Sequence, residues 1–394
     1  MILPRGVSLD PTKSRRWWVF FLLGLLSGAA LFSIGITLLV NFFTIRSTSR
    51  YVMHEVSTPR GHDTFSVALD TSDGSQGAYF IPVYIGTGSQ TYADTLLDSG
   101  SADTWFDIGL NFTVNSVTYK GFPNQQYEID YMQGNVYGTL GQDKLAIVNF
   151  SWLQTIGVVS DGEVDVNGII GISRGGCDSR NLCSMENWPL NQSVLGFYYD
   201  TSSWNGIFMA GYVDQSLYCA EGTKLTYLPQ VGDYYWTGSV DVAFNDHSLG
   251  KGLTAIFDTG TTYFMVSANL NNTISTLIGP NSLCNTSSIT LTISGQQFKI
   301  PSSVLVTSDE LGHCMLRIDV LPPDQGFDVI VGATFLVNFY TVFDIGNNKM
   351  GFCPPKPGLL PSTRRLADDP LGRLLLPRPR RRYSHHRKLN NTHV

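Results

Sequence analysis

A short motif occurs twice in this 394-residue chain, and its repetition constrains the fold more than any other feature. Both copies read apolar, apolar, Asp, Ser/Thr, Gly, Ser/Thr, and their aspartates are Asp98 and Asp258. An apolar pair and a glycine follow each copy, at Gly171 and Gly332, which lie 73 and 74 residues beyond the respective aspartate. Matching motifs at matching spacings indicate two copies of one structural unit. We therefore predict two related lobes, with a boundary near residues 215–240.

The fold class follows from the sequence beyond residue 79. Short runs rich in Val, Ile, Tyr, Phe and Thr are broken by Gly, Asn, Asp and Ser, which is typical of strands joined by turns. Helical periodicity is scarce, and residues 267–277 are the best short candidate. The prediction is a mainly β, bilobal protein whose lobes span residues 78–225 and 226–356, with an active-site cleft between them.

The repeated aspartates suggest a chemistry. One Asp-Ser/Thr-Gly is ordinary turn sequence, but a two-fold pseudosymmetry can bring two of them to one interface. Carboxylates about 3 Å apart cannot both ionise, so the pair supplies an acid and a base at once. Peptide hydrolysis through a bound water needs both, and it needs no metal, cofactor or covalent intermediate. The motif residues predicted to support Asp98 and Asp258 by tight backbone and hydroxyl groups are Ser99, Gly100, Ser101, Thr259, Gly260 and Thr261.

These motifs carry a family resemblance, which covers residues 79–352. The segment 84–88 resembles the strand before the first active-site loop of the pepsin family, and Trp105 stands seven residues after Asp98 as in that family. Residues 330–336, 339–344 and 347–352 resemble its closing strands. The resemblance implies the pepsin-like acid protease fold and an aspartic endopeptidase that cuts extended polypeptides beside bulky apolar residues at acid pH.

The resemblance also implies a flap, a β-hairpin that closes over substrate. Tyr131 and Gly134 fall where the family places it, and Tyr131 is expected to hydrogen-bond Trp105. Residues 132–133 are Met and Gln, where the family more often has small residues. The alternative is that Tyr131 is simply one residue of an amphipathic strand.

Six cysteines allow 15 disulfide connectivities, and reduced core cysteines are a further alternative. The pairs considered are Cys284 with Cys314, Cys177 with Cys183, and Cys219 with Cys353. The first of these matches the family's disulfide in the second lobe. The loop disulfide that usually follows the family's tryptophan is absent, which resembles fungal members.

The N-terminus predicts membrane insertion. Residues 17–43 carry no charged side chain, and such a length exceeds the roughly 20 residues that cross a bilayer. More cations precede this run than follow it closely, so residues 1–16 are predicted to be cytosolic. A cleaved signal peptide is the alternative, with a possible cut within residues 27–30. Both place the body in the lumen or outside the cell, with residues 44–77 as a flexible stalk or short propeptide.

Charge is distributed unevenly along the chain. Residues 70–362 hold 10 Lys and Arg against 27 Asp and Glu, a net charge of −17, whereas residues 363–394 have a net charge of +7. The acidic body predicts a protein adapted to acid pH, and the alternative is that the charge serves solubility alone. Either way, it disfavours nucleic-acid binding. Residues 357–394 are predicted to be a disordered basic tail, with its arginines either solvated or cut by a convertase.

Glycosylation sequons agree with a secretory compartment. They are Asn111, Asn149, Asn191, Asn271, Asn285 and Asn390. Two other functions remain open for a monomer of this kind: a pepsin-fold binding protein without turnover, and a structural cell-surface glycoprotein. Two intact aspartate motifs argue against both.

Overall fold

The computed structural model divides the chain into two compact units, Met1–His54 and Glu55–Val394, and all the residues it describes belong to the second. The described residues are 65–69, 79–87, 91–110, 116–132, 134–148, 150–164, 166–175, 180–190, 192–200, 205–278, 287–308 and 314–359. The predictions for residues 1–43 and for the basic tail beyond residue 359 fall outside them. No helix within these ranges is long and apolar enough to cross a membrane.

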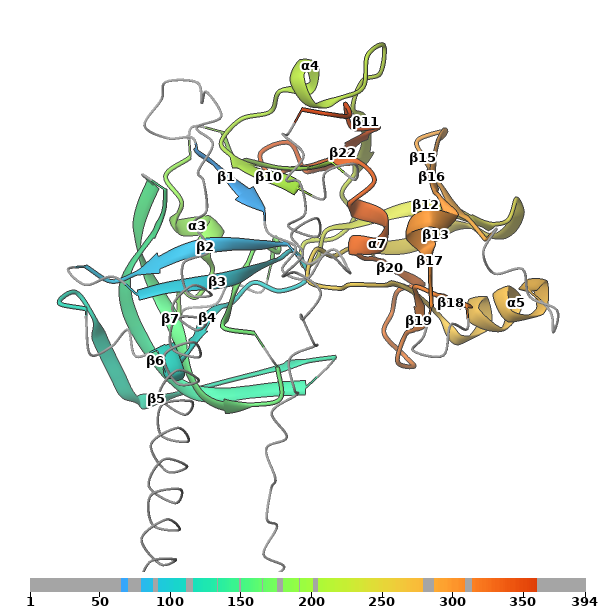
Figure 1. Cartoon of the computed structure of the whole chain (residues 1–394). Coiled ribbons are helices and arrows are strands. Elements are labelled where there is room, and N and C mark those ends of the chain that lie inside the picture. The colour runs from blue at the N-terminus through green and yellow to red at the C-terminus, as the bar shows by residue number, and fades with distance from the viewer. Residues whose placement is uncertain are drawn as a thin grey trace, which may run out of the picture. The chain divides into compact units, whose positions relative to one another are not determined.

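The first half of the body forms a seven-stranded sheet in the order β2-β3-β8-β4-β7-β6-β5. Its strands are joined by turns and loops, as the sequence predicted (Figure 1). They are β2 (Phe80–Ile85), β3 (Thr91–Asp98), β4 (Thr104–Asp107), β5 (Lys120–Tyr131), β6 (Gly134–Ile147), β7 (Phe150–Gly162) and β8 (Gly168–Gly171).

The second half forms another seven-stranded sheet, in the order β16-β15-β12-β13-β20-β14-β19. Figure 1 shows these strands in yellow to orange, away from the cyan and green strands of the first sheet. They are β12 (Thr237–Phe244), β13 (His247–Phe257), β14 (Phe264–Val266), β15 (Ile289–Ile293), β16 (Gln296–Ile300), β19 (Ile318–Val320) and β20 (Val329–Val331).

The predicted repeat is confirmed in the topology of these two sheets. In the first, β8 runs parallel to β3 and antiparallel to β4, and in the second, β20 runs parallel to β13 and antiparallel to β14. Asp98 lies opposite Gly171, and Phe257, just before Asp258, lies opposite Val331, just before Gly332. The spacing between aspartate and glycine is therefore the length of chain needed before β8 or β20 returns to pair with the strand that leads to the aspartate.

A third sheet combines both halves, in the order β1-β10-β9-β21-β22-β11. The neighbours β9 and β21 come from opposite halves of the chain. Its strands are β1 (Phe65–Leu69), β9 (Val194–Asp200), β10 (Asn205–Ala210), β11 (Thr226–Pro229), β21 (Tyr340–Asp344) and β22 (Lys349–Cys353). This sheet joins the two halves through backbone hydrogen bonds rather than through side chains alone.

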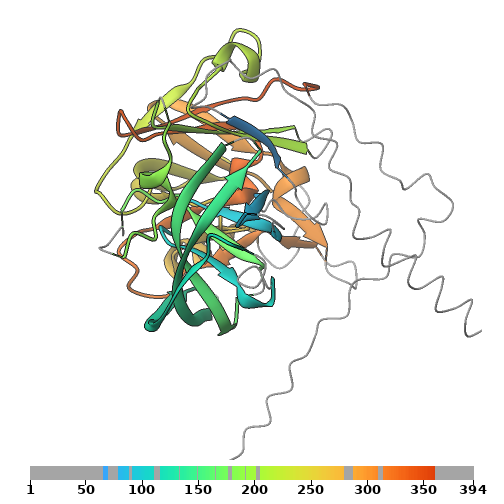
Figure 2. The same cartoon turned by 90° about the vertical axis from the view of Figure 1, so that its left-hand side faces the viewer.

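The strand β1 differs from the flexible stalk or propeptide predicted for this stretch. It pairs with β10 over five residues, and Figure 2 shows it in dark blue. Val67 and Leu69 are buried in the core, so their period-two spacing is that of a half-buried strand. The polar residues around this short run concealed the pattern.

The remaining elements are short. Among the described residues the longest helix is α5 (Ala268–Ile278), which confirms the one helical segment predicted from the sequence. The others are β17 (Val306–Ser308), β18 (Cys314–Leu316), η1 (Ile108–Leu110), α3 (Ser184–Asn187), α4 (Gln215–Tyr218), α6 (Ser302–Leu305) and α7 (Ala333–Leu336).

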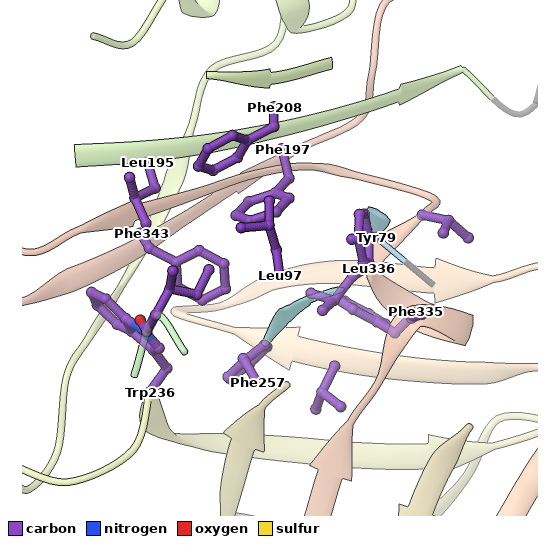
Figure 3. Close-up of a cluster of buried hydrophobic side chains, with 14 of the residues drawn as sticks. Tyr79, Leu97, Leu195, Phe197, Phe208, Trp236, Phe257, Phe335, Leu336 and Phe343 are labelled. Carbon is purple, nitrogen blue, oxygen red and sulfur yellow. The ribbon is translucent and has the colours of Figure 1, made fainter. Parts of the chain in front are cut away.

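The largest buried cluster contains side chains from both halves of the body, some of which Figure 3 shows. Leu97 and Phe257, the residues just before Asp98 and Asp258, are fully buried in it. The rings of Trp236 and Phe343 are in contact, with 4.8 Å between their centroids and a tilt of 51°, and such aromatic pairs add to the stability that area burial gives. The site is therefore built on core packing that both halves share.

Cys219 and Cys353 form a disulfide, which is one of the predicted pairs. Cys183 and Cys314 are also disulfide-bonded. Cys177 and Cys284 lie outside the described residues, so their pairings stay predictions.

Of the predicted glycosylation sites, only Asn271 is described. It lies on α5 with a half-buried side chain rather than on a surface loop. The other five sequons fall outside the described residues.

Candidate active site

Asp98 and Asp258 meet at the junction of the two halves. Asp98 ends β3 and Asp258 follows β13, and both are buried, with 5% and 8% of their surface exposed. Their carboxyl groups face the same small space, since a Cβ atom on Gly100, in the Asp98 motif, would come within 2.6 Å of Asp258 Oδ2. The fold thus brings together two carboxyl groups that are 160 residues apart in the sequence.

Each carboxyl group is held by the same two donors of its own motif. The backbone N–H of Gly100 donates to Asp98 Oδ1, and that of Gly260 donates to Asp258 Oδ1, both over 2.8 Å. The hydroxyl of Ser101 donates to Asp98 Oδ2 over 2.5 Å, and the hydroxyl of Thr261 donates to Asp258 Oδ2 over 2.6 Å. Together with Ser99 and Thr259, all six predicted support residues form three symmetric pairs.

Ser99 and Thr259 connect the two motifs beneath the carboxyl groups. The hydroxyl of Ser99 donates to the carbonyl oxygen of Phe257 over 2.8 Å, and the hydroxyl of Thr259 donates to that of Leu97 over 2.7 Å. Both residues are buried. Hydrogen bonds between buried groups resist displacement because a lost partner leaves a polar group unsatisfied, so this network fixes the distance between the halves.

The two glycines make room for the opposite carboxyl group. A Cβ atom on Gly100 would lie 2.6 Å from Asp258 Cγ, and one on Gly260 would lie 2.4 Å from Asp98 Oδ1. Any side chain here would therefore push the carboxyl groups apart.

Burial, together with the negative charge of Asp258, raises the pKa of Asp98 well above its usual range. The hydrogen bonds from Ser101 and Gly100 oppose this shift but do not cancel it. A buried pair of this kind retains one proton where isolated carboxyl groups would have lost both, and the proton belongs to the pair.

A sequence profile of the family described as "Eukaryotic aspartyl protease" matches residues 78–355, which is more than half of the chain. The chain belongs to this family. Its fold is accordingly the mainly β, pepsin-like fold, and its activity is that of an aspartic endopeptidase acting on polypeptides.

Curated relatives agree with this assignment. This aspartyl protease is 25% identical to gastricsin of Cavia porcellus over 331 residues, covering 73% of this chain and 83% of the relative. It is 26% identical to human gastricsin over 330 residues, covering 73% and 84%. Pepsin B of Canis lupus familiaris is 26% identical over 321 residues, covering 70% and 80%.

The predicted flap of this aspartyl protease corresponds to the β5–β6 hairpin, where Tyr131 pairs with Gly134. The indole N–H of Trp105 donates to the Tyr131 hydroxyl oxygen over 2.8 Å, the contact expected from the sequence. Burial and the charge of Asp98 raise the pKa of Tyr131 far above its usual range. The Tyr131 hydroxyl is therefore close to the aspartates, while Met132 next to it is half exposed.

Sequence reasoning missed Tyr235. Burial, Tyr234 and the charges of Asp258 and Asp98 raise the pKa of Tyr235, and its side chain packs on the small apolar cluster that contains Ile256. The Trp236 indole N–H donates to the carbonyl oxygen of Ile172 in the first half over 2.9 Å and fixes this segment. The sequence feature that could have indicated Tyr235 is the aromatic run 234–236 at the lobe boundary. Such a run is equally typical of residues buried in a hydrophobic core.

Metal binding has no geometric support within the described ranges. They contain no cluster of three or more His, Cys, Asp or Glu side chains that could hold an ion.

Proposed function

We propose that Asp98 and Asp258 are the catalytic residues of this aspartic endopeptidase. The observation that carries the proposal is the close approach of two buried carboxyl groups across the opposite motif's glycine, each oriented by a glycine N–H and a hydroxyl. Such a pair holds one proton and one negative charge, which are the two properties that acid and base catalysis need.

In the proposed reaction the ionised carboxylate takes a proton from a water bound between the pair, and the water oxygen forms a bond to the peptide carbonyl carbon. The protonated carboxyl group donates its proton to the carbonyl oxygen, giving a neutral tetrahedral diol. The first carboxyl group then donates its proton to the peptide nitrogen as the carbon–nitrogen bond breaks, and the second carboxyl group, now ionised, takes a proton from one hydroxyl group of the diol. The products are a carboxylic acid and an amine, and the pair is again singly protonated.

The β5–β6 hairpin is proposed to bind substrate, with Tyr131 held by Trp105 and Gly134 closing its turn. A hairpin beside the aspartates can add backbone hydrogen bonds to an extended peptide and exclude water from the reaction. This explains why the Tyr131 hydroxyl lies near Asp98.

The decisive experiment uses the purified chain and an unfolded protein as substrate at about pH 4, an acidity suited to a shared proton. Cleavage is expected, together with inhibition by a statine peptide, which mimics the tetrahedral species. Asp98→Asn and Asp258→Asn should each abolish cleavage, while Asp344→Asn, on β21, should not. Cleavage that persists in both active-site variants would refute the proposal, and statine binding without turnover would favour a binding protein instead.

We further propose the arrangement of the whole chain. Residues 17–43 would anchor a type II membrane protein, or act as a cleaved signal, with a lumenal or extracellular body of two lobes, residues 78–225 and 226–356. The support is the long uncharged run and the sequons. Protease protection of the body in intact microsomes, and its release or retention after carbonate washing, would separate anchor from secreted protein. The body would act as a monomer without nucleic acid.

A further inference from the structure

An ion pair lies a few residues from the catalytic motif and is not used in the proposed mechanism. Asp103 follows Asp98 by five residues and is buried, with 7% of its surface exposed. Arg180 Nη2 lies 3.7 Å from Asp103 Oδ2, and 38% of the Arg180 side chain is exposed. One partner is therefore fixed inside the protein, and the other reaches solvent.

The segment that carries Arg180 is held against the strand that carries Trp105. Asp103 and Cys183 form a β-bridge, and the backbone N–H of Thr104 donates to the carbonyl oxygen of Leu182 over 3.1 Å. The hydroxyls of Thr104 and Ser184 lie 2.7 Å apart. These contacts fix the backbone beside Arg180, so its guanidinium has a restricted range of positions.

This position is next to the flap. Leu182 packs in the same apolar cluster as Trp105 and Tyr131. Burial and the neighbouring Tyr131 and Asp103 raise the pKa of Tyr127, and the charge of Arg180 opposes this shift. The chain next to Arg180 therefore borders the apolar cluster to which the proposed flap contributes.

A cation is unusual in this acidic body, which has few Lys and Arg. A guanidinium presents five N–H donors in a planar fork that suits a carboxylate. Asp103 orients this fork from the buried side, and the exposed part faces outward. Substrate side chains on this side of the cut would meet one oriented positive charge in a largely apolar setting.

We propose that Arg180 is a specificity-determining residue that binds an acidic side chain of the polypeptide substrate, and that Asp103 is its positioning residue. The inference rests on the proposed function, because it concerns the same site. Its ligand is a glutamate or aspartate flanking the scissile bond.

The test compares cleavage of paired peptides. A parent peptide that the enzyme cuts at one bond between bulky apolar residues is varied at each flanking position in turn, with Glu in one member and Gln in the other. The ratio of kcat/KM for Glu over Gln cancels any general effect on activity. At about pH 5.5, where a peptide Glu is ionised, one position should favour Glu by about threefold to tenfold, as expected for a partly exposed charged contact.

Variants identify the residue responsible. Arg180→Gln should bring the ratio at that position to about one, and Arg180→Lys should keep part of it. Since Arg180→Gln leaves Asp103 buried without its cation, the double variant Asp103→Asn with Arg180→Gln provides a second measurement that leaves no buried charge. Lys349, on β22, is a matched cation that lies 3.7 Å from Asp344. Lys349→Gln should leave the ratio unchanged.

Acidity gives an independent readout. At about pH 3.5 the peptide Glu is protonated, so the preference for Glu over Gln should disappear. Titration of the enzyme's own groups, namely the aspartate pair, Asp103, Tyr127 and Tyr131, affects the Glu peptide and the Gln peptide equally and cancels in the ratio. Equal rates for Glu and Gln at every position, or a preference that survives in both Arg180 variants lacking the cation, would overturn this inference alone. Failure to cleave any peptide would overturn the proposed function with it.

Discussion

Ser99 and Thr259 exchange backbone hydrogen bonds across the junction of the two halves: the N–H of each donates to the hydroxyl oxygen of the other, over 2.9 and 2.8 Å. Each hydroxyl therefore accepts one bond and donates another to a carbonyl oxygen. No water is needed to complete this closed set. The separation of the two carboxyl groups is thus set by residues that are buried beneath them.

Replacing Thr259 by Val should lower the stability of the protein, because valine has the same shape as threonine but lacks the hydroxyl group. The Ser99 N–H and the Leu97 carbonyl group would lose their partners in the core, which predicts a loss of about 2–4 kcal/mol in the free energy of unfolding. Thr259→Ser keeps the hydroxyl and should lose much less. Urea unfolding of both variants at acid pH provides the measurement, and equal midpoints for Val and Ser would contradict the role of the hydroxyl.

Asp98→Asn should inactivate the enzyme and stabilise it at neutral pH. Because the folded pKa of Asp98 is raised, its stabilising contribution is complete below the unfolded value of about 3.9 and is lost as pH rises through the folded value. Asn is neutral throughout, so the variant escapes this loss.

Thermal unfolding across pH checks that prediction. The variant and the wild type should unfold alike below about pH 3.9, and the variant should gain on the order of 1 kcal/mol towards neutral pH. A variant that is equally destabilised at all pH values would argue against a repulsive carboxyl pair.

Gly260→Ala should impair catalysis with little effect elsewhere in the protein. The added methyl group would lie 2.4 Å from Asp98 Oδ1, and a displacement of a catalytic group by about 1 Å can cost roughly 100-fold in rate. Gly346→Ala is the matched control, since its nearest neighbour would be 3.9 Å away. Steady-state kcat for the two variants tests the point, and similar activity would show that the clearance is unimportant.

Tyr131→Phe should lower kcat/KM by about tenfold, because it leaves the buried Trp105 N–H without its acceptor and loosens the hairpin. Tyr137→Phe removes a hydroxyl from an exposed position of the same hairpin and should have little effect. Peptide kinetics on both variants would distinguish a positioned flap from an ordinary strand, on which the two substitutions would act alike.

Much of this architecture was predictable because it is encoded locally. The repeated motif identified Asp98 and Asp258 and the return strands at Gly171 and Gly332, and the periodicity of residues 267–277 predicted α5. The contact between Tyr131 and Trp105 followed from family resemblance rather than from any property of the two residues.

Other features depend on partners that are distant in the sequence. The strand β1 has two buried side chains and gains its place only by pairing with β10. No pattern in the neighbouring sequence marks Tyr235 or Arg180. Their surroundings form only when strands and loops that are distant in the sequence come together. Local periodicity contains no information about such meetings, so the charged pair at Asp103 could not be located in advance.

The sheet shared by the two halves has a consequence for biosynthesis. Strand β9 is complete at residue 200, but its neighbour β21 begins at residue 340. At about 5–20 residues per second, a ribosome takes on the order of 10 s to supply it. During that interval the nascent chain presents an open strand edge, which is able to pair with another chain until β21 covers it.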